Sequence, residues 1–352
     1  MLRQIKRGSL QILKKTGAFK LVRDSEWRRQ RLLILCYHST SVADEHLWRP
    51  ALFMSLPQFE KRLDILLESA STVLPLGEAL ERLWSGTLPR ASVALTFDDG
   101  TADFYTQVYP MLKSRGLPAT VYQTTYYSDF QRPIFNLSCS YLLWQRRGSF
   151  FPAGKDLDLE EPMDLRTEAS RHAIVLKLVH RSFEQDLTGT QKDEIVRRLA
   201  RMLGVDYQQL VAKRILHLMT PAEISELAKA GVDFQLHTHR HRTPNDAALF
   251  KKEIEDNRDR LREETGKVGV DFCYPSGVYQ PEFLPWLKEE NIRSATTCDT
   301  SLASAQDNPL LLPRLVDTAR RSDLDYESWL VGVGHILSQR RKSTQKYVPA
   351  GD

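Results

Sequence analysis

The chain has 352 residues, 41% of them apolar and 27% charged, which is enough for one large α/β domain or two smaller ones. Its four cysteines contain no C-x-x-C pair, and this excludes a zinc ribbon and a thioredoxin-type redox motif. The net charge is +4, but residues 1–31 carry ten Lys and Arg against two acids, so this segment has +8 and the remainder −4. A basic segment on a mildly acidic body favours an anionic partner surface.

Residues 1–31 are predicted to form a basic amphipathic arm. Its apolar residues follow a helical spacing that Gly8 and Gly17 interrupt; they are Leu2, Ile5, Leu10, Leu13 and Phe19. Two interpretations are open: a helix that lies reversibly on an anionic membrane, or a helix that packs against the body of the protein.

The cellular location follows from what the N-terminal segment lacks. It contains no continuous apolar stretch of the kind that a secretory signal requires. The run from Leu32 to Tyr37 falls far short of the ~20 residues that span a bilayer. Cys36, Cys273 and Cys298 lie in apolar runs that predict buried thiols and a reducing compartment. We therefore expect a cytoplasmic protein, peripheral at the inner face of the membrane where the arm binds lipid.

Alternating strands and helices are predicted in residues 32–320. The strands are expected at 32–37, 92–97, 119–124, 232–236, 272–274, 294–297 and 312–316. The helices are expected at 57–70, 102–114, 221–230, 246–265 and 281–290. This alternation predicts a parallel sheet covered by helices.

Residues 127–215 interrupt the alternation and predict an inserted helical subdomain. Two long helical patterns occupy 167–183 and 191–203, after a start that is rich in aromatic residues. These aromatic residues are Tyr126, Tyr127, Phe130 and Phe135. Residues 321–352 are assigned to a C-terminal tail, of which the last 14 are expected to be disordered.

Two adjacent carboxylates follow the strand at 92–97. The segment Thr96–Gly100 reads T-F-D-D-G, so Asp98 and Asp99 lie where an α/β fold places active-site residues. Adjacent side chains diverge, and the two carboxylates can therefore serve different tasks, one holding a metal and the other taking a proton. The alternative is an ordinary helix N-cap.

Three histidines follow the strand at 232–236, in the segment His237-Thr-His-Arg-His241. Neutral imidazoles suit zinc, cobalt or nickel, and two of them with one carboxylate leave metal positions open for water and substrate. The alternative is a surface histidine cluster. A third segment, Phe272-Cys-Tyr-Pro-Ser-Gly277, predicts a tight turn whose backbone N–H groups could stabilise an oxyanion.

The three segments, in this order, resemble the NodB-like polysaccharide deacetylases, carbohydrate esterase family 4. The family motifs T-F-D-D-G and H-[ST]-x-x-H are both intact, whereas the third, R-x-P-[YF], keeps only its proline in the segment from Cys273 to Ser276. Arg314 is our candidate to replace the missing arginine. The resemblance covers roughly residues 31–317 without the insertion, and it implies an incomplete or distorted (β/α) barrel.

The segment Leu33-Ile-Leu-Cys-Tyr-His38 further resembles permuted members of the family that act on exopolysaccharides, in which the catalytic acid comes from this N-terminal strand. His38 is therefore the expected acid, and the alternatives are a core histidine at this position or an acid at His335.

The mechanism that the resemblance implies is removal of an acetyl group from an N-acetylated sugar, in a polysaccharide or a lipid-linked glycan. It assigns a divalent metal, zinc with cobalt or nickel as alternatives, to Asp99, His237 and His241. It assigns the general base to Asp98 and an oxyanion-binding N–H to Ser276. In this mechanism His38 protonates the departing amine. The aromatic start of the insertion would stack on sugar rings or only anchor the subdomain.

Two other functions stay open from the sequence. One is a metal hydrolase for another amide, such as an N-formyl sugar or a cyclic imide, and the other is an inactive carbohydrate-binding relative. Nucleic acid is not an expected partner, because no recognition motif accompanies the basic arm.

Overall fold

The computed structural model describes residues 2–152, 154, 157, 159 and 161–338. One curved sheet with the strand order β11-β10-β9-β6-β5-β1-β12 forms the centre, while β13 pairs with β1 and β4 with β5. Its strands are β1 (Arg31–Tyr37), β4 (Thr72–Val73), β5 (Ser92–Asp99), β6 (Thr120–Gln123), β9 (Asp233–Leu236), β10 (Asp271–Cys273), β11 (Ser294–Thr296), β12 (Ala303–Ser304) and β13 (Leu315–Val316). All pairs are parallel except β1 with β12.

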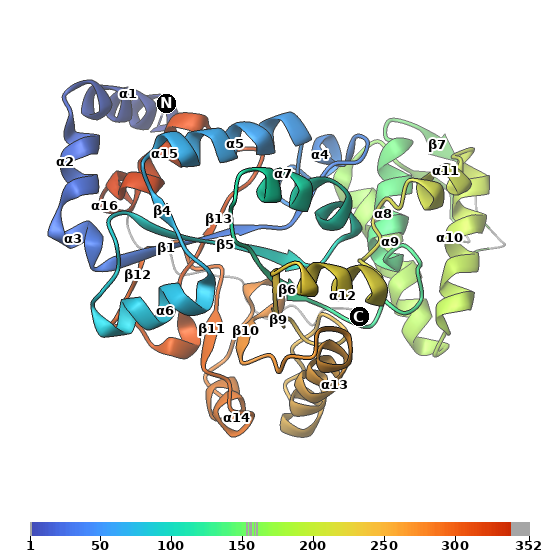
Figure 1. Ribbon diagram of the computed structural model, residues 1–352. Coiled ribbons are helices and arrows are strands. Elements are labelled where there is room, and N and C mark those ends of the chain that lie inside the picture. The colour runs from blue at the N-terminus through green and yellow to red at the C-terminus, as the bar shows by residue number, and fades with distance from the viewer. Residues whose placement is uncertain (1, 153, 155–156, 158, 160, 339–352) are drawn as a thin grey trace.

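The helices surround this sheet (Figure 1). Those of the barrel are α4 (Glu45–Trp48), α5 (Leu56–Glu68), α6 (Leu76–Ser85), α7 (Tyr109–Ser114), α12 (Pro221–Lys229), α13 (Ala247–Thr265) and α14 (Phe283–Glu289), with a π-helical turn before α7 at Phe104–Val108. Short 3-10 turns lie at Pro275–Gly277 and Pro309–Leu311. The expected α/β alternation is therefore present.

The segment 312–316 nearly closes the sheet into a barrel. Leu312 forms a bridge to Thr296 of β11, while Leu315 and Val316 pair with Leu35 and Cys36 of β1. The segment thus spans the two edges of a strongly curled half-barrel, and Arg314 lies between its two attachments. The expectation of an incomplete or distorted (β/α) barrel is confirmed.

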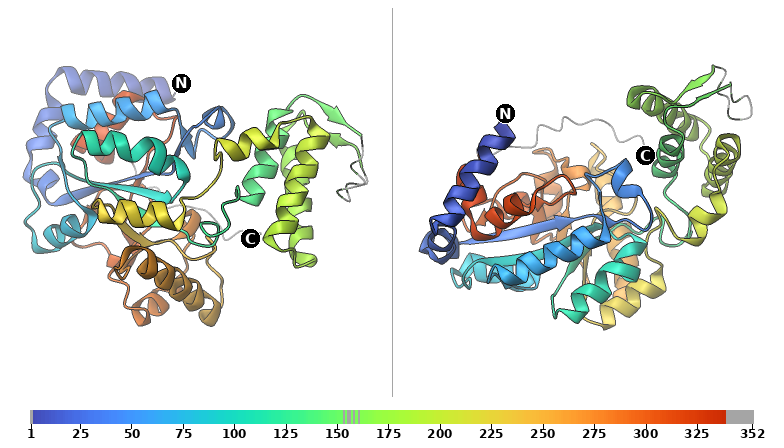
Figure 2. Two further views of the ribbon diagram at one scale, coloured as in Figure 1. Left: turned by 45° about the vertical axis from the view of Figure 1, so that its right-hand side comes forward. Right: turned by 90° about the horizontal axis from the view of Figure 1, so that it is seen from above.

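The helices of the insertion stand beside the barrel (Figure 2). They fold around a hydrophobic cluster of their own. Its elements are α8 (Phe135–Gln145), the hairpin strands β7 (Phe150–Phe151) and β8 (Met163–Asp164), α9 (Glu168–Glu184), α10 (Gly189–Leu203) and α11 (Tyr207–Ala212). Thr167 caps α9, and a capping box of Thr188 and Gln191 starts α10, as the local sequence requires. One barrel segment joins this cluster: Phe53 of β3 (Phe53–Met54), which pairs with β2 (Ser39–Thr40), is buried in it.

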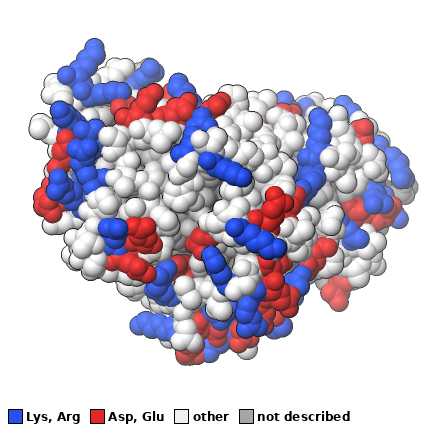
Figure 3. Space-filling view, viewed as in Figure 1, with Lys and Arg blue, Asp and Glu red and all other residues white. Residues whose placement is uncertain are grey.

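The N-terminal arm packs on the C-terminal helices. Helices α1 (Leu2–Lys15), α2 (Ala18–Asp24) and α3 (Glu26–Arg29) lie beside α15 (Asp323–Val331) and α16 (Val333–Leu337), and Lys and Arg gather over α1 and α2 (Figure 3). Leu10 and Phe19 are buried against Val331. Arg28 is fully buried and donates hydrogen bonds to the carbonyl oxygens of Leu330, Arg31 and Ser92.

This packing corrects the boundary expected at residue 320. Residues 323–337, which the sequence analysis assigned to a tail, are helical, and Trp329 and Leu330 are buried in the barrel core. The helices were missed because their apolar residues are spread around the helix and show no clear stripe, which is typical of a helix covered on several sides. The expected disordered residues 339–352 lie outside the described part of the chain.

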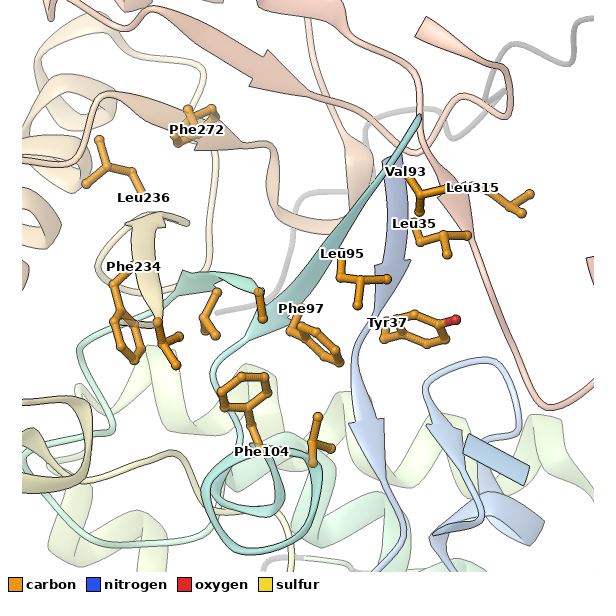
Figure 4. Close-up of a cluster of buried hydrophobic side chains, with 14 of the residues drawn as sticks. Leu35, Tyr37, Val93, Leu95, Phe97, Phe104, Phe234, Leu236, Phe272 and Leu315 are labelled. Carbon is orange, nitrogen blue, oxygen red and sulfur yellow. The ribbon is translucent and has the colours of Figure 1, made fainter. Parts of the chain in front are cut away.

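The two faces of β1 and β5 carry different residues. Leu35 and Tyr37, with Val93, Leu95 and Phe97, point to one face and pack against Phe104 and the outer helices (Figure 4). The alternate residues face the other side, and they are Leu32, Ile34, Cys36, Ala94, Thr96 and Asp98. The second series is apolar where the strands begin and polar where they end, so the strands' carboxyl ends supply the polar side chains of a site.

Candidate active site

Asp99, His237 and His241 come together at the ends of β5 and β9. The Oδ1 atom of Asp99 lies 3.3 Å from Nε2 of His237 and 3.2 Å from Nε2 of His241. Asp99 has a left-handed backbone with φ of 71°, which interrupts the strand alternation after Asp98. The two adjacent carboxylates therefore diverge, as the sequence suggested: Asp99 contacts the histidines and Asp98 contacts Arg314.

The turn after Asp99 requires glycine. Gly100 has φ of 76°, and a Cβ atom there would lie 1.9 Å from Oε1 of the buried Gln123. Any side chain at this position would displace Gln123, which donates hydrogen bonds to the carbonyl oxygens of Asp99 and Thr124. The last residue of the T-F-D-D-G segment thus keeps the carboxylate turn in its conformation.

The histidine loop is held from the neighbouring strand and from α13. Nδ1 of His237 lies 2.8 Å from the carbonyl oxygen of Cys273, which requires the Nδ1–H tautomer and leaves Nε2 as the free electron-pair donor. Asn257 of α13 is fully buried, and its Oδ1 accepts a hydrogen bond from the backbone N–H of His237 at 2.9 Å. Its Nδ2 donates to the carbonyl oxygen of Gln123 and to Thr125.

A buried carboxylate supports the rest of this loop. Glu253 of α13 accepts hydrogen bonds from the backbone N–H and the guanidinium of Arg240 and from Nε of Arg242. Its carbonyl oxygen also accepts from the backbone N–H of His239. His241 has φ of 55°, a conformation that costs energy for a residue with a side chain and persists only where the surroundings hold it.

Asp98 forms a bidentate ion pair with Arg314. Both residues are buried, and the two Asp98 oxygens lie 2.7 and 2.8 Å from Nη1 and Nη2 of Arg314. Burial alone would raise the pKa of Asp98, but the charge and hydrogen bonds of Arg314 outweigh it and hold the pKa well below its usual range. The carboxylate is therefore ionised across the neutral range.

Arg314 reaches the position where the third family motif has its arginine. Its Nη2 lies 3.0 Å from Sγ of Cys273, the residue at the arginine position of that motif, and its Nε donates to the carbonyl oxygen of Thr297. The thiols of Cys36 and Cys273 lie 3.4 and 3.5 Å from Oδ2 of Asp98. Burial raises the pKa of both thiols, so they surround the ion pair as neutral groups.

His38 follows directly after β1 and lies beside the same carboxylate. Its Nε2 is 4.0 Å from Oδ2 of Asp98, and its Nδ1 is buried with no hydrogen-bond partner in the described structure. His38 and Asp99 line one pocket together with residues from both junctions of the insertion, among them Leu137 and Leu216. The insertion therefore borders the site through its two ends.

Two further residues that the sequence analysis singled out are Ser276 and His335. Ser276 is exposed, and its backbone is left-handed, with φ of 56°, in the turn that directly follows β10. β10 is the strand whose Cys273 carbonyl oxygen contacts His237. His335 does not belong to the group around Asp98 and Asp99. Its ring packs between those of Trp27 and Trp329. His335 accepts a hydrogen bond from the backbone N–H of Leu302, a structural contact.

The three groups Asp99, His237 and His241 fit a divalent metal. Metal–ligand bonds of about 2.0–2.1 Å place neighbouring ligand atoms roughly 3.0–3.4 Å apart, which agrees with the two Asp99–histidine distances. The three ligand atoms all lie within 4.8 Å of one another. Oδ1 of Asp99 is buried and no described donor makes a hydrogen bond to it, so a cation would satisfy an otherwise costly group.

Comparison with known proteins gives the family. Residues 85–295 match the sequence profile described as polysaccharide deacetylase. The chain belongs to the polysaccharide deacetylase family. This membership confirms the resemblance seen in the motifs and makes the protein a hydrolase of amide bonds that removes acetyl groups. No curated protein is similar enough in sequence to match the chain.

Solved structures of deacetylases share the fold. The Streptococcus pyogenes deacetylase PplD, solved in complex with acetate, is 20% identical with a TM-score of 0.54, over 83% of this chain and 94% of that one. IcaB from Ammonifex degensii is 17% identical with a TM-score of 0.52, over 86% and 97%. A de-N-acetylase from Aggregatibacter actinomycetemcomitans is 15% identical with a TM-score of 0.51, over 83% and 97%.

Sequence reasoning missed the residues that hold the site from behind. Asn257 and Glu253 lie in the middle of a charged helix, where such residues are normally solvent-exposed. Their four-residue spacing puts them on one face of α13, together with the buried Phe250, Ile254 and Leu261. A polar residue on the apolar face of a helix next to a histidine motif is the signal that could have identified them.

Proposed function

We propose that this polysaccharide deacetylase is a metal-dependent enzyme that removes the acetyl group from an N-acetylated sugar. The observation that carries the proposal is the separation of the two carboxylates. Asp99 contacts His237 and His241, whereas Asp98 is held by Arg314 and lies next to His38. Metal binding and proton transfer thus have separate groups at the same strand ends.

The metal would be held by Asp99, His237 and His241, and when bound it supplies a Lewis acid that polarises the amide carbonyl and the attacking water. Asp98, kept ionised by Arg314, takes the proton of the water that attacks the carbonyl carbon. The backbone N–H of Ser276 stabilises the negative charge on the former carbonyl oxygen. His38 then gives a proton to the sugar nitrogen as the C–N bond breaks, leaving acetate and a free amine.

Acetate release tests this function. The full chain loaded with zinc should release acetate from N-acetylated hexosamine oligosaccharides, a chelator should abolish the release, and zinc or cobalt should restore it. Release of formate from N-formyl sugars, or opening of a cyclic imide, without any release of acetate would contradict the proposed substrate class. Acetate release that is insensitive to prolonged chelation would contradict the metal.

We further propose that the enzyme is cytoplasmic and binds anionic lipid at the inner membrane surface through its basic arm, where a lipid-linked glycan would be presented. No described helix is long and apolar enough to cross a membrane. Leu10 and Phe19 are engaged with the body of the protein, so they cannot insert into lipid. The attraction therefore rests on exposed cations such as Lys15 and Lys20, and it should be reversible and sensitive to salt.

A further inference from the structure

A second hollow lies between the insertion and the barrel, beside the pocket that contains His38. Its volume is about 890 Å³, near the upper end of the roughly 300–1,000 Å³ that is typical of ligand pockets. We call it the Trp48 groove, after the residue at its barrel side. Its polar and aromatic lining includes Trp48, Arg49, Trp144, Arg171, His172 and Arg320. A hollow of this size has room for more than one sugar unit.

Aromatic rings form one side of the groove. Trp48 is half-buried, its ring lies 5.2 Å from that of Tyr141, and Tyr141 stacks on Trp144 at 6.0 Å. These contacts fix the rings, because each is packed against the next and against α8. Trp48 also stacks on Phe53 at 5.9 Å, so the packed rings form a rigid wall of the groove.

Three arginines line the groove without acidic partners. In the described structure, no carboxylate lies within ion-pair distance of the side chains of Arg49, Arg171 or Arg320. Arg49 stacks on Trp48, with its guanidinium carbon 4.8 Å from the ring centre, and burial lowers its pKa while the charge of Glu168 opposes the shift. Three positive charges face one negative charge, Glu168, so the groove keeps an excess of positive charge.

The groove adjoins the catalytic pocket at one short turn. Leu52 lines both hollows, and its carbonyl oxygen accepts a hydrogen bond from the backbone N–H of Ser39, the residue after His38. The backbone N–H groups of Leu52 and Phe53 in turn bond to the carbonyl oxygen of Arg49. The two hollows therefore adjoin at Leu52, and a glycan with one sugar at His38 would reach the groove by passing over this residue.

We propose that the Trp48 groove binds an anionic stretch of the glycan substrate, in which sugars next to the acetylated unit carry carboxylate or phosphate groups. Guanidinium groups bind both anions through paired hydrogen bonds. The inference rests on the proposed function, because it names the class of glycan that this active site selects. It differs from that function in its residues, none of which belongs to the metal or proton-transfer groups.

Affinity electrophoresis of the zinc-loaded full chain tests the groove by binding alone. The gels contain hyaluronan as the carboxylate polymer, poly(N-acetylglucosamine 1-phosphate) as the phosphate polymer, or glycol chitin as the neutral N-acetylated polymer. We expect one anionic polymer to retard the protein more than glycol chitin does, and the polymer that does so identifies the anion. Arg49→Gln should weaken that binding by about tenfold, because it removes charge-assisted hydrogen bonds to the anion.

Two further variants control the test. Arg320→Gln removes a second groove cation at an exposed position and should act in the same direction even if Arg49→Gln fails to fold. Arg201→Gln removes an exposed cation of the insertion outside the groove and should leave binding unchanged. Any one of three results would overturn the inference. The neutral and anionic polymers could retard the protein equally, neither anionic polymer could retard it, or Arg320→Gln and Arg201→Gln could have equal effects. Intact binding without acetate release would instead contradict the proposed function.

Discussion

The barrel and the insertion solve different problems with different kinds of structure. In the barrel, side chains from strand ends that are far apart in the sequence meet at one site, where buried hydrogen bonds to a neighbouring strand, to α13 or to Arg314 fix His237 and Asp98. The insertion is one continuous segment of capped helices around its own hydrophobic cluster, and among the residues that the structure describes it meets the site at its junctions. We therefore expect the barrel to determine the reaction and the insertion to affect which glycan reaches it.

The largest expected effect comes from replacing the two adjacent carboxylates of the barrel one at a time. Asp98→Asn should retain metal and lose about 10²–10⁴-fold in turnover, because it removes the base but none of the proposed ligands. Asp99→Asn should lose the metal itself. Metal content after dialysis and the rate of acetate release measure the two effects. Metal loss in Asp98→Asn with normal content in Asp99→Asn would reverse the assignment, and thermal unfolding controls for the unpaired Arg314.

The next effect concerns the support behind the histidines. Asn257→Ala removes the hydrogen bond to the His237 backbone, and it should lower metal affinity by about 10–100-fold, as loss of such supporting contacts does at other metal sites. Competition with a metal indicator dye measures the affinity. Asn136→Ala, on the exposed first turn of α8, is the matched amide deletion in the insertion and should leave it unchanged. Equal affinities in the two variants would show that α13 does not position the ligand.

Destabilising the insertion should leave the metal site intact. Leu178 is buried in the insertion cluster, and Leu178→Ala should cost about 2–5 kcal/mol of the stability of that region. Hydrogen exchange should then increase in α8 to α11, while the metal affinity stays at the wild-type value. Leu95→Ala makes the same deletion in the barrel core and should affect both. A matching loss of metal affinity in Leu178→Ala would mean that the two regions are one cooperative unit.

The smallest effect concerns the arm, which belongs to neither region. Changing both Lys15 and Lys20 to Gln should weaken binding to anionic vesicles by about 2 kcal/mol, roughly thirtyfold, at low salt. Vesicle co-sedimentation measures it, and changing Lys177 and Lys213 of the insertion to Gln is the control of equal charge. These substitutions avoid deleting the arm, which would also remove the buried Arg28. Equal binding of the two double variants would exclude the arm as the membrane contact.

The aromatic start of the insertion illustrates a question that the sequence left open. Tyr126 packs against the rings of Tyr127, Phe130 and His239, and the guanidinium of Arg240 lies over it. Phe135 is buried in the insertion cluster. These contacts favour anchoring over sugar stacking for Tyr126 and Phe135. Anchoring and stacking need the same residue types, so composition alone could not distinguish them.

The amino-acid sequence by itself determined the family, the alternation of strands and helices, and the positions of Asp98, Asp99, His237 and His241 at strand ends. These features are local, because hydrophobic periodicity and a short motif each lie within a few consecutive residues. Only the tertiary structure decided that Arg314 pairs with Asp98, that Asn257 holds His237, and that residues 323–337 complete the fold. Each of these depends on contacts between residues more than 15 positions apart, and closure of the barrel, which no local pattern encodes, brings Arg314 to Asp98.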